Sequence, residues 1–296
     1  MLEFDGLRKS YGTNLVLDGV TFTVAPGQMY GFCGANGAGK TTTMRIALGL
    51  ALADAGEVRW QGRTVDLEVR RRIGYMPEER GLYPKMPVVE QLEYFARLHG
   101  MSAPAARRSA GELLDSMGLG ERQRDALEKL SLGNQQRVQL AAALVSNPDV
   151  LILDEPFSGL DPTGVDALAA NLAERRSRGV PVLFSSHQLE LVERLCDAVG
   201  ILAGGTMVAS GTVDQLRERE SKRQLRVVIP GSDGSWARQL DFAKVDSDRE
   251  GEVLLQLDDP DRDQDVLTAA MAAGQVSQFG WRQPTLVEIF REAVTA

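Results

Sequence analysis

The sequence has few cysteines and lacks any long apolar run. Its two cysteines, Cys33 and Cys196, form no metal-binding or disulfide pattern, and each lies in an apolar segment typical of a buried free thiol. No stretch approaches the roughly 20 consecutive apolar residues of a membrane-spanning helix. The first residues also lack the basic and then apolar pattern of a signal peptide. We therefore expect a cytoplasmic location and assign the cysteines no chemistry.

An excess of positive charge is also missing. The formal net charge of −8 opposes broad binding to nucleic acid, because such binding needs a basic face that displaces counterions. Residues 224–296 contain seven basic and thirteen acidic residues, so most of the negative charge lies there. We expect no nucleic-acid partner, and any anionic ligand must be held by a local site.

The apolar residues follow the periods of a mixed α/β protein. Val20–Val24 alternates apolar and polar residues, as a half-buried strand does. Met29–Cys33 reads as a buried strand, and Thr41–Leu50 has helical composition. Val150–Leu153 and Val180–Phe184 are short apolar runs, typical of parallel strands that are buried on both faces.

Composition also suggests the domain limits. A helical pattern over Val88–Met117, interrupted at Pro104, indicates a helical subdomain of about residues 88–145. The core pattern stops after Gly211, and the charged run Arg217–Arg223 reads as a helix end and linker. We predict a main domain of residues 1–217 and a small accessory α/β domain of residues 224–296. Within the latter we expect, in order, a strand (Leu225–Ile229), a helix, a strand (Val253–Leu257), a helix (Asp263–Ala273), a strand and a helix (Leu286–Val294).

A glycine-rich segment fits the phosphate-binding loop pattern and lies between a predicted strand and a predicted helix. It reads Gly34-Ala35-Asn36-Gly37-Ala38-Gly39-Lys40-Thr41 and is followed by Thr42. Glycines let backbone N–H groups converge on phosphates, Lys40 adds a positive charge, and the Thr41 hydroxyl can bind Mg²⁺. The alternative is a chance glycine-rich turn.

Asp154 and Glu155 follow the predicted strand Val150–Leu153. A buried strand delivers such carboxylates to the sheet edge where the phosphates of a nucleotide would lie. There Asp154 is placed to hold Mg²⁺ and Glu155 to deprotonate an attacking water. Taken alone, the pair would be ordinary acidic residues at a strand end. The phosphate-binding loop upstream favours the catalytic interpretation.

The segment Leu130-Ser131-Leu132-Gly133-Asn134-Gln135 closely resembles the signature sequence of ATP-binding cassette proteins, usually written LSGGQ, with Leu132 and Asn134 as departures. Ser131 is also a suitable N-cap for a helix over Gln135–Val145, and the two interpretations are compatible. The resemblance implies that Ser131, Gly133 and Asn134 face the γ-phosphate held by another subunit.

Other motifs of that family occur at the expected places along the chain. Ser158-Gly159-Leu160-Asp161 resembles the D-loop, His187 resembles the switch histidine, and Tyr11 matches the aromatic residue that stacks on adenine. Alone, each would have a structural explanation, since single histidines and strand-edge tyrosines are common. His99 lies in a mixed polar helix and is expected at the surface.

One departure concerns the loop that joins the core to the helical subdomain. The family usually has Gln there, and this chain has Glu78, whose carboxylate can bind Mg²⁺ but lacks the N–H donor. Glu78, the form of the signature and a tail that reads Pro284-Thr285-Leu286 resemble bacterial drug-, antibiotic- or sodium-exporter ATPases.

The resemblance implies a P-loop NTPase core with an antiparallel β subdomain and a helical subdomain. It implies hydrolysis of ATP with Mg²⁺, a homodimer in the ATP-bound state, and a separate membrane permease at the inner face of the membrane. The implied catalytic residues are Glu155, His187 and Lys40, and the implied metal ligands are Thr41, Asp154 and Glu78. The implied nucleotide-binding residues are Tyr11, Gly34, Asn36, Gly37, Ala38, Gly39, Lys40, Thr41, Thr42, Glu78, Ser131, Gly133, Asn134 and Asp161.

Other functions of the same motifs remain as alternatives. Cassette proteins of DNA repair carry a long coiled coil between Lys40 and Asp154, and cassette translation factors carry two phosphate-binding loops; this chain has neither feature. A soluble cassette ATPase, or a cassette that binds ATP only as a regulatory module, is the remaining rival to transport. Retention of Lys40, Asp154, Glu155 and His187 disfavours a degenerate module.

Overall fold

The computed structural model describes residues 1–79, 81–220, 224–282 and 285–295. Met1–Val213 forms one compact unit and Asp214–Glu292 forms a second. The predicted domain limits at 217 and 224 remain a prediction. Of the residues quoted above, Arg223 and Pro284 lie outside the described ranges. No helix among the described residues is long and apolar enough to cross a membrane.

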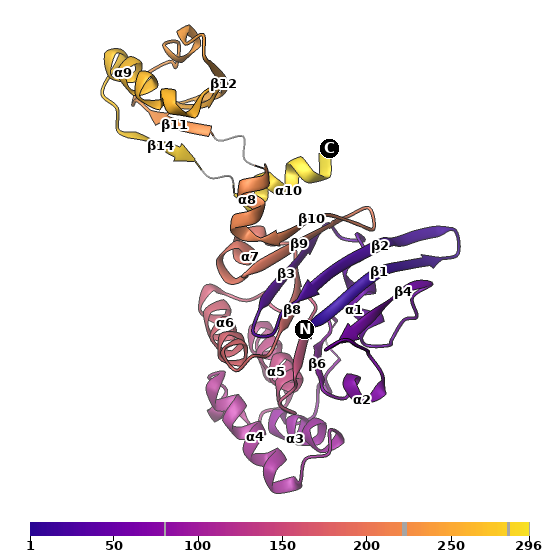
Figure 1. Cartoon of the computed structure of the whole chain (residues 1–296). Helices are drawn as coiled ribbons and strands as arrows, with labels where there is room; N and C mark the ends of the chain where they lie inside the picture. The colour runs from indigo at the N-terminus through magenta and orange to yellow at the C-terminus, as the bar shows by residue number, and fades with distance from the viewer. Residues whose placement is uncertain (80, 221–223, 283–284, 296) are drawn as a thin grey trace. The chain divides into compact units, whose positions relative to one another are not determined.

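The first unit is built around a six-stranded sheet with the order β10-β9-β3-β8-β7-β6. Figure 1 labels its strands β3, β6, β8, β9 and β10. All neighbouring strands are parallel except β9 and β10. The parallel strands β3, β7 and β8 are buried along their whole length, as expected for strands that are covered on both faces. The six strands are β3 (Met29–Gly34), β6 (Ile73–Met76), β7 (Val150–Leu153), β8 (Val182–Ser186), β9 (Ala198–Ala203) and β10 (Thr206–Thr212).

A second, antiparallel sheet carries the N-terminal segment. Its order is β2-β1-β4-β5, with β1 (Leu2–Tyr11), β2 (Asn14–Val24), β4 (Ala55–Trp60) and β5 (Arg63–Thr64). The two sheets share one core, in which the Phe22 ring stacks on Phe4 of its own sheet and on Tyr30 and Phe32 of β3. This aromatic contact fixes β3, and thus the loop that follows it, against the β1–β2 hairpin.

Helices of the first unit follow the strands or form the helical subdomain. Figure 1 shows α3 and α4 together at the end of the unit that also holds α5, and α5 contacts both of them and β6. Pro104 lies in the first turn of α4, where proline is tolerated, so it begins a helix after the break at His99. The helices are α1 (Lys40–Ala47), α2 (Leu67–Arg70), α3 (Val88–Leu98), α4 (Ala103–Ser116), η1 (Gly120–Arg122), η2 (Leu127–Lys129), α5 (Leu132–Leu144), α6 (Pro162–Ser177) and α7 (Leu189–Leu195).

The second unit has an antiparallel sheet with the order β12-β13-β11-β14, and its α9 shares a core with β11 and β13 through Val266 and Ala270. The small α/β architecture was predicted, but two elements differ. The helix expected after β11 is only a short 3-10 turn, η3, and β12 was not predicted because its sequence, AKVDSDR, lacks apolar alternation. The elements from Val213 onward are α8 (Val213–Glu220), β11 (Gln224–Val228), η3 (Ala237–Gln239), β12 (Ala243–Arg249), β13 (Glu252–Leu257), η4 (Pro260–Arg262), α9 (Asp263–Ala273), β14 (Gln278–Arg282) and α10 (Leu286–Thr295).

Candidate functional site

A cleft of about 570 Å³ lies where the loops after β3, β6 and β7 meet the β1–β2 hairpin. The carboxyl ends of parallel strands lie at one edge of a sheet, so side chains that are distant in sequence converge there. The lining residues are Tyr11, Asn14, Val16, Asn36, Gly37, Gly39, Lys40, Thr41, Thr42, Glu78, Asp154 and Glu155. All except Asn14 and Val16 were predicted from the sequence.

The glycine-rich loop between β3 and α1 presents the first turn of α1 to this cleft. Gly39 precedes α1 with a φ of 109°, and a Cβ there would come within 2.5 Å of the Leu17 side chain, so the position requires glycine. The first N–H groups of a helix lack intrahelical acceptors, and no acidic residue occupies this first turn. The loop and helix end therefore form a cradle for an anion.

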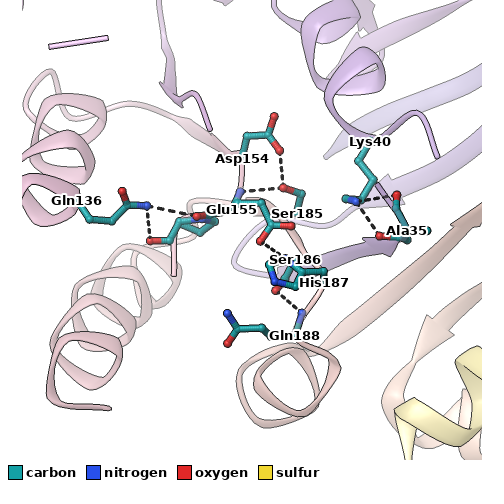
Figure 2. Close-up of polar contacts among 11 residues, drawn as sticks. Ala35, Lys40, Gln136, Asp154, Glu155, Ser185, Ser186, His187 and Gln188 are labelled. Carbon is teal, nitrogen blue, oxygen red and sulfur yellow. Dashed lines mark hydrogen bonds and ion pairs between the residues drawn. The ribbon is translucent and has the colours of Figure 1, made fainter. Parts of the chain in front are cut away.

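Lys40 completes the cradle. Its side chain is buried, and its Nζ donates to the backbone oxygens of Gly34, at 2.7 Å, and Ala35, at 3.1 Å, as Figure 2 shows. The acceptors are backbone oxygens of the last residue of β3 and the first residue of the loop, so the ammonium is held at the loop by neutral partners. A cation in this position attracts the negative charge of a phosphate group.

The two carboxylates that follow β7 occupy different environments. Asp154 is almost fully buried, and its Oδ1 accepts a hydrogen bond from the Ser185 hydroxyl at 2.5 Å. Its Oδ2 is buried and has no hydrogen-bond partner among the described residues. A buried, unpaired carboxylate oxygen is costly unless a cation or donor binds it, so Asp154 fits a ligand that the chain itself does not supply.

Glu155 is held in an unusual backbone conformation. Its φ of 50° lies in the left-handed region, which costs a non-glycine residue of order 1–2 kcal/mol. Its N–H donates to the Ser185 hydroxyl at 2.8 Å. Burial raises the pKa of the Glu155 carboxyl, and the hydrogen bond with His187 partly offsets this effect. An elevated carboxyl pKa brings the group closer to the range suited to accepting a proton.

His187 follows β8 and contacts the same carboxylate. Its Nδ1 lies 3.0 Å from Glu155 Oε2, and the imidazole is more than half exposed. Figure 2 shows the His187 ring beside Glu155, below the buried Asp154–Ser185 contact. The histidine can orient Glu155 while its other nitrogen remains available for a ligand.

Tyr11 and Glu78 border the cleft from different elements. Tyr11 ends β1 with about half of its surface exposed, and the Lys9 ammonium lies 5.2 Å from its ring centre. Glu78 follows β6 and is exposed. The aromatic ring offers a flat apolar face, and the carboxylate offers oxygen ligands to a hard cation.

Seven predicted residues are not among those that line the cleft: Gly34, Ala38, Ser131, Gly133, Asn134, Asp161 and His187. Ser131 is the N-cap of α5 and accepts from the Asn134 N–H at 3.4 Å, while Gly133 lies in the first turn of that helix. Asp161 is the N-cap of α6 and accepts from the Gly164 N–H at 2.7 Å. The signature segment therefore has a local capping role within this chain, and any contact with a nucleotide must involve a nucleotide that is bound elsewhere.

Several residues that organise the site carry no recognisable signal in the sequence. Ser185 reads as part of an apolar strand end, and Gln136 and Gln139 read as ordinary helix residues. Asn14 and Val16 line the cleft because the hairpin turn returns them beside Tyr11. Only the spacing of three residues between the two glutamines, which places them on one helix face, could have indicated a shared role.

Comparison with known proteins gives two family matches. Residues 17–158 match the ABC transporter family, and residues 211–294 match the C-terminal domain of the DrrA1-3-like ATP-binding proteins. The first matched segment lies within the first compact unit, and the second matched segment covers the second unit.

Similar curated proteins include ATP-binding subunits of ABC transporters. The uncharacterised ABC transporter ATP-binding protein YhaQ of Bacillus subtilis is 38% identical, with 100% of this chain and 99% of that protein covered. The linearmycin resistance ATP-binding protein LnrL of Bacillus subtilis is 35% identical over 74% of this chain and 71% of LnrL. The Nod factor export ATP-binding protein I of Paraburkholderia xenovorans is 40% identical over 73% of this chain and 72% of that protein.

Solved structures agree on the fold. A structure of the ATP-binding subunit of an ABC transporter, 35% identical, superposes with a TM-score of 0.69 over 74% of this chain and 92% of that chain. A dimeric structure of the bacterial ABC transporter cassette MJ0796, 24% identical, gives a TM-score of 0.66 over 72% of this chain and 99% of that chain. The second likeness, at this identity, concerns the fold alone.

Proposed function

Because this chain belongs to the ATP-binding cassette transporter family as an ATP-hydrolysing subunit, we propose that it drives export of a substrate through a separate membrane permease. The observation that carries the proposal is the cleft in which Lys40, Asp154 and Glu155 converge. Its relatives include proteins named for linearmycin resistance and Nod factor export, which supports the direction of transport. A regulatory cassette outside transport finds no support among them.

In this proposal the cleft holds Mg²⁺ and ATP. The N–H groups of the glycine-rich loop and the Lys40 ammonium receive the β- and γ-phosphates, and Tyr11 stacks on the adenine. The unpaired Asp154 Oδ2 and the Thr41 hydroxyl offer oxygen ligands to Mg²⁺, with Glu78 at the border of the cleft. When bound, Mg²⁺ neutralises charge on the phosphate oxygens.

Glu155 acts as the general base in the proposed reaction. Its carboxylate takes a proton from water, the water oxygen forms a bond to the γ-phosphorus, and the bond from that phosphorus to the leaving ADP oxygen breaks. Burial raises the pKa of Glu155, which favours proton acceptance. His187 keeps the carboxylate oriented through its contact with Oε2.

We assign the signature segment to the ATP of a second subunit. Within one chain, Ser131, Gly133 and Asn134 start α5 outside the cleft, and Asp161 caps α6, also outside it. A helix start with free N–H groups is a second anion cradle, suited to the far side of a γ-phosphate. The functional unit in the ATP-bound state is then a homodimer with two shared sites.

A separate groove supplies a surface for the permease. It has a volume of about 240 Å³ and lies between the edge strand β6 and helices α3 and α5. Its wall includes the apolar side chains Ile73, Leu82 and Phe95, with His99 at its border. The groove adjoins Pro77, next to Glu78, so a permease segment bound there would contact the loop that borders the nucleotide. In this proposal the protein works at the cytoplasmic face of the membrane.

Co-purification tests the transport proposal. We expect the tagged full-length chain, extracted from its native membrane, to carry a permease that stimulates its ATPase activity. Replacing Leu82 by Glu would put a charge into the groove and should abolish co-purification without lowering the basal ATPase rate. An intact complex with the Leu82→Glu variant would show that the groove is not the docking surface.

Mixing two inactive variants tests the shared site. Lys40→Ala damages the loop, and Ser131→Arg blocks the signature. A mixed dimer has one site with both lesions and one with neither, so partial ATPase activity should return. A normal rate for Ser131→Arg by itself would exclude a role of the signature at the phosphate.

The C-terminal unit is proposed to be an accessory domain that regulates or stabilises dimerisation. It carries most of the negative charge and matches the DrrA1-3-like C-terminal domain. The residues that line the nucleotide cleft all belong to the first unit. Binding of ATP to a single subunit is therefore expected not to need it.

A further inference from the structure

Helix α5 carries two buried glutamines that contact both acidic loops of the cleft. Gln136 and Gln139 are each no more than about 5% exposed, and their side-chain Nε2 atoms donate to backbone oxygens of other segments. The acceptors lie in the loop after β7 and in the loop after β6. These are the loops that carry Glu155 and Glu78.

Gln136 holds the backbone of the proposed base. Its Nε2 donates to the Glu155 oxygen at 3.3 Å and to the Pro156 oxygen at 3.0 Å, as Figure 2 shows. Glu155 has the left-handed φ of 50°, which a glutamate adopts only when its surroundings impose it. The Ser185 hydroxyl accepts the N–H of the same residue. The Glu155 backbone is therefore held on its N–H side by β8 and on its carbonyl side by α5.

Gln139 holds the second loop in the same manner. Its Nε2 donates to the Pro77 oxygen at 2.6 Å and to the Glu79 oxygen at 3.2 Å. Pro77 and Glu79 flank Glu78 in the chain, so the Gln139 side chain binds the backbone on both sides of the residue whose carboxylate borders the cleft. The two glutamines are three residues apart and share one face of α5.

If the two glutamines only stabilised the fold, their acceptors would have no reason to lie at or beside the proposed functional carboxylates. Gln91 of α3 shows what such a role looks like: it is fully buried and binds the Tyr83 N–H and the oxygens of Tyr83 and Met86, none of which lines the nucleotide cleft. Gln136 and Gln139 instead bind the backbone at or beside two proposed functional carboxylates. Both belong to the helix whose first turn is the signature segment.

We propose that Gln136 and Gln139 are positioning residues, through which α5 sets the backbone of both acidic loops in its own chain. The inference rests on the proposed function, because α5 begins at the segment assigned to the second subunit's ATP. A nucleotide bound at Ser131 would then act on the Glu155 and Glu78 of the chain that carries Ser131. One rigid helix would join the two sites of the dimer.

Substitution by methionine tests the two amides. Gln136→Met keeps the length of the side chain and removes both N–H donors, and Gln91→Met is the matched control. We expect Gln136→Met to lower kcat about 100-fold, since a displacement of about 1 Å at a reacting group has an effect of this order, with the Kd for ATP unchanged. Gln139→Met is expected mainly to raise the Mg²⁺ concentration that gives half-maximal activity. Gln91→Met should change neither quantity.

Amide hydrogen exchange gives a readout that does not depend on catalysis. Exchange at Glu155, Phe157 and Ser158 should accelerate in full-length Gln136→Met and stay unchanged in Gln91→Met. If Gln136→Met does not fold, Gln136→Glu replaces the donor with an acceptor at equal size and is measured in the same way. Unchanged exchange together with a wild-type kcat would overturn the inference. An inactive wild-type protein would contradict the proposed function instead, and the exchange result would still decide the role of Gln136.

Discussion

The hydroxyl of Ser185 joins the Asp154 carboxylate to the backbone of Glu155, so its removal should affect stability and catalysis together. Ser185 is fully buried, donates to Asp154 Oδ1 at 2.5 Å and accepts the Glu155 N–H at 2.8 Å. In Ser185→Ala, the Asp154 side chain loses the hydroxyl that donates to its Oδ1, and the buried N–H of Glu155 loses its acceptor. Each loss is worth roughly 1–3 kcal/mol, so we expect the free energy of unfolding to fall by about 3 kcal/mol.

Ser186 provides the matched control because it is the next residue and is also buried. Its hydroxyl accepts the Gln188 N–H, at 3.0 Å, and has no other hydrogen-bond partner among the described residues, so Ser186→Ala should cost about 1 kcal/mol. In calorimetry, about 3 kcal/mol corresponds to a Tm lowered by about 6–12 °C for a unit of this size. The kcat of Ser185→Ala should also fall, whereas Ser185→Thr keeps the hydroxyl and should retain part of both properties. Equal Tm values for Ser185→Ala and Ser186→Ala would refute the reasoning.

Three further predictions concern the nucleotide and the base. Glu155→Gln removes the basicity of the carboxylate at constant size, so kcat should fall about 10²–10⁴-fold while ATP still binds. An ATP-stabilised dimer should then accumulate in size-exclusion chromatography. A monomer with bound ATP would contradict this prediction. Glu78→Gln keeps one ligand oxygen and should impair hydrolysis less than Glu78→Ala, and equal, near-normal rates with the permease present would remove the role of Glu78. Tyr11→Ala should weaken ATP binding in titration by about 1–3 kcal/mol, the usual worth of base stacking, while Tyr83→Ala, which is similarly exposed but outside the cleft, should not.

The C-terminal unit can be tested in the same titration. A chain that ends at Arg217 should bind ATP as the whole chain does, because the residues that line the cleft belong to the first unit. Weak binding by a truncated chain that remains folded would show that the second unit contributes to the site.

The sequence by itself determined the architecture of the main unit and most of the wall of the cleft. Asp154 could be placed because it directly follows the apolar strand β7, and Lys40 because it follows the apolar strand β3 after the glycine-rich loop; parallel strands bring such positions to one edge of a sheet. The α/β class of both units was confirmed, as was the family that the signature segment indicated. The polar strand β12 was missed because an exposed edge strand needs little apolar alternation.

Tertiary structure alone decided how the acidic loops are held. Nothing in the sequence connects Gln136 with Glu155, or Ser185 with Asp154, because these contacts join segments 19 and 31 residues apart through backbone and hydroxyl groups that have no motif. The unpaired Asp154 Oδ2 is likewise a property of packing, since burial is what separates it from water and other donors. Local patterns identify which residues reach the edge of the sheet, whereas the orientation of those residues depends on the helix and strand packed against them.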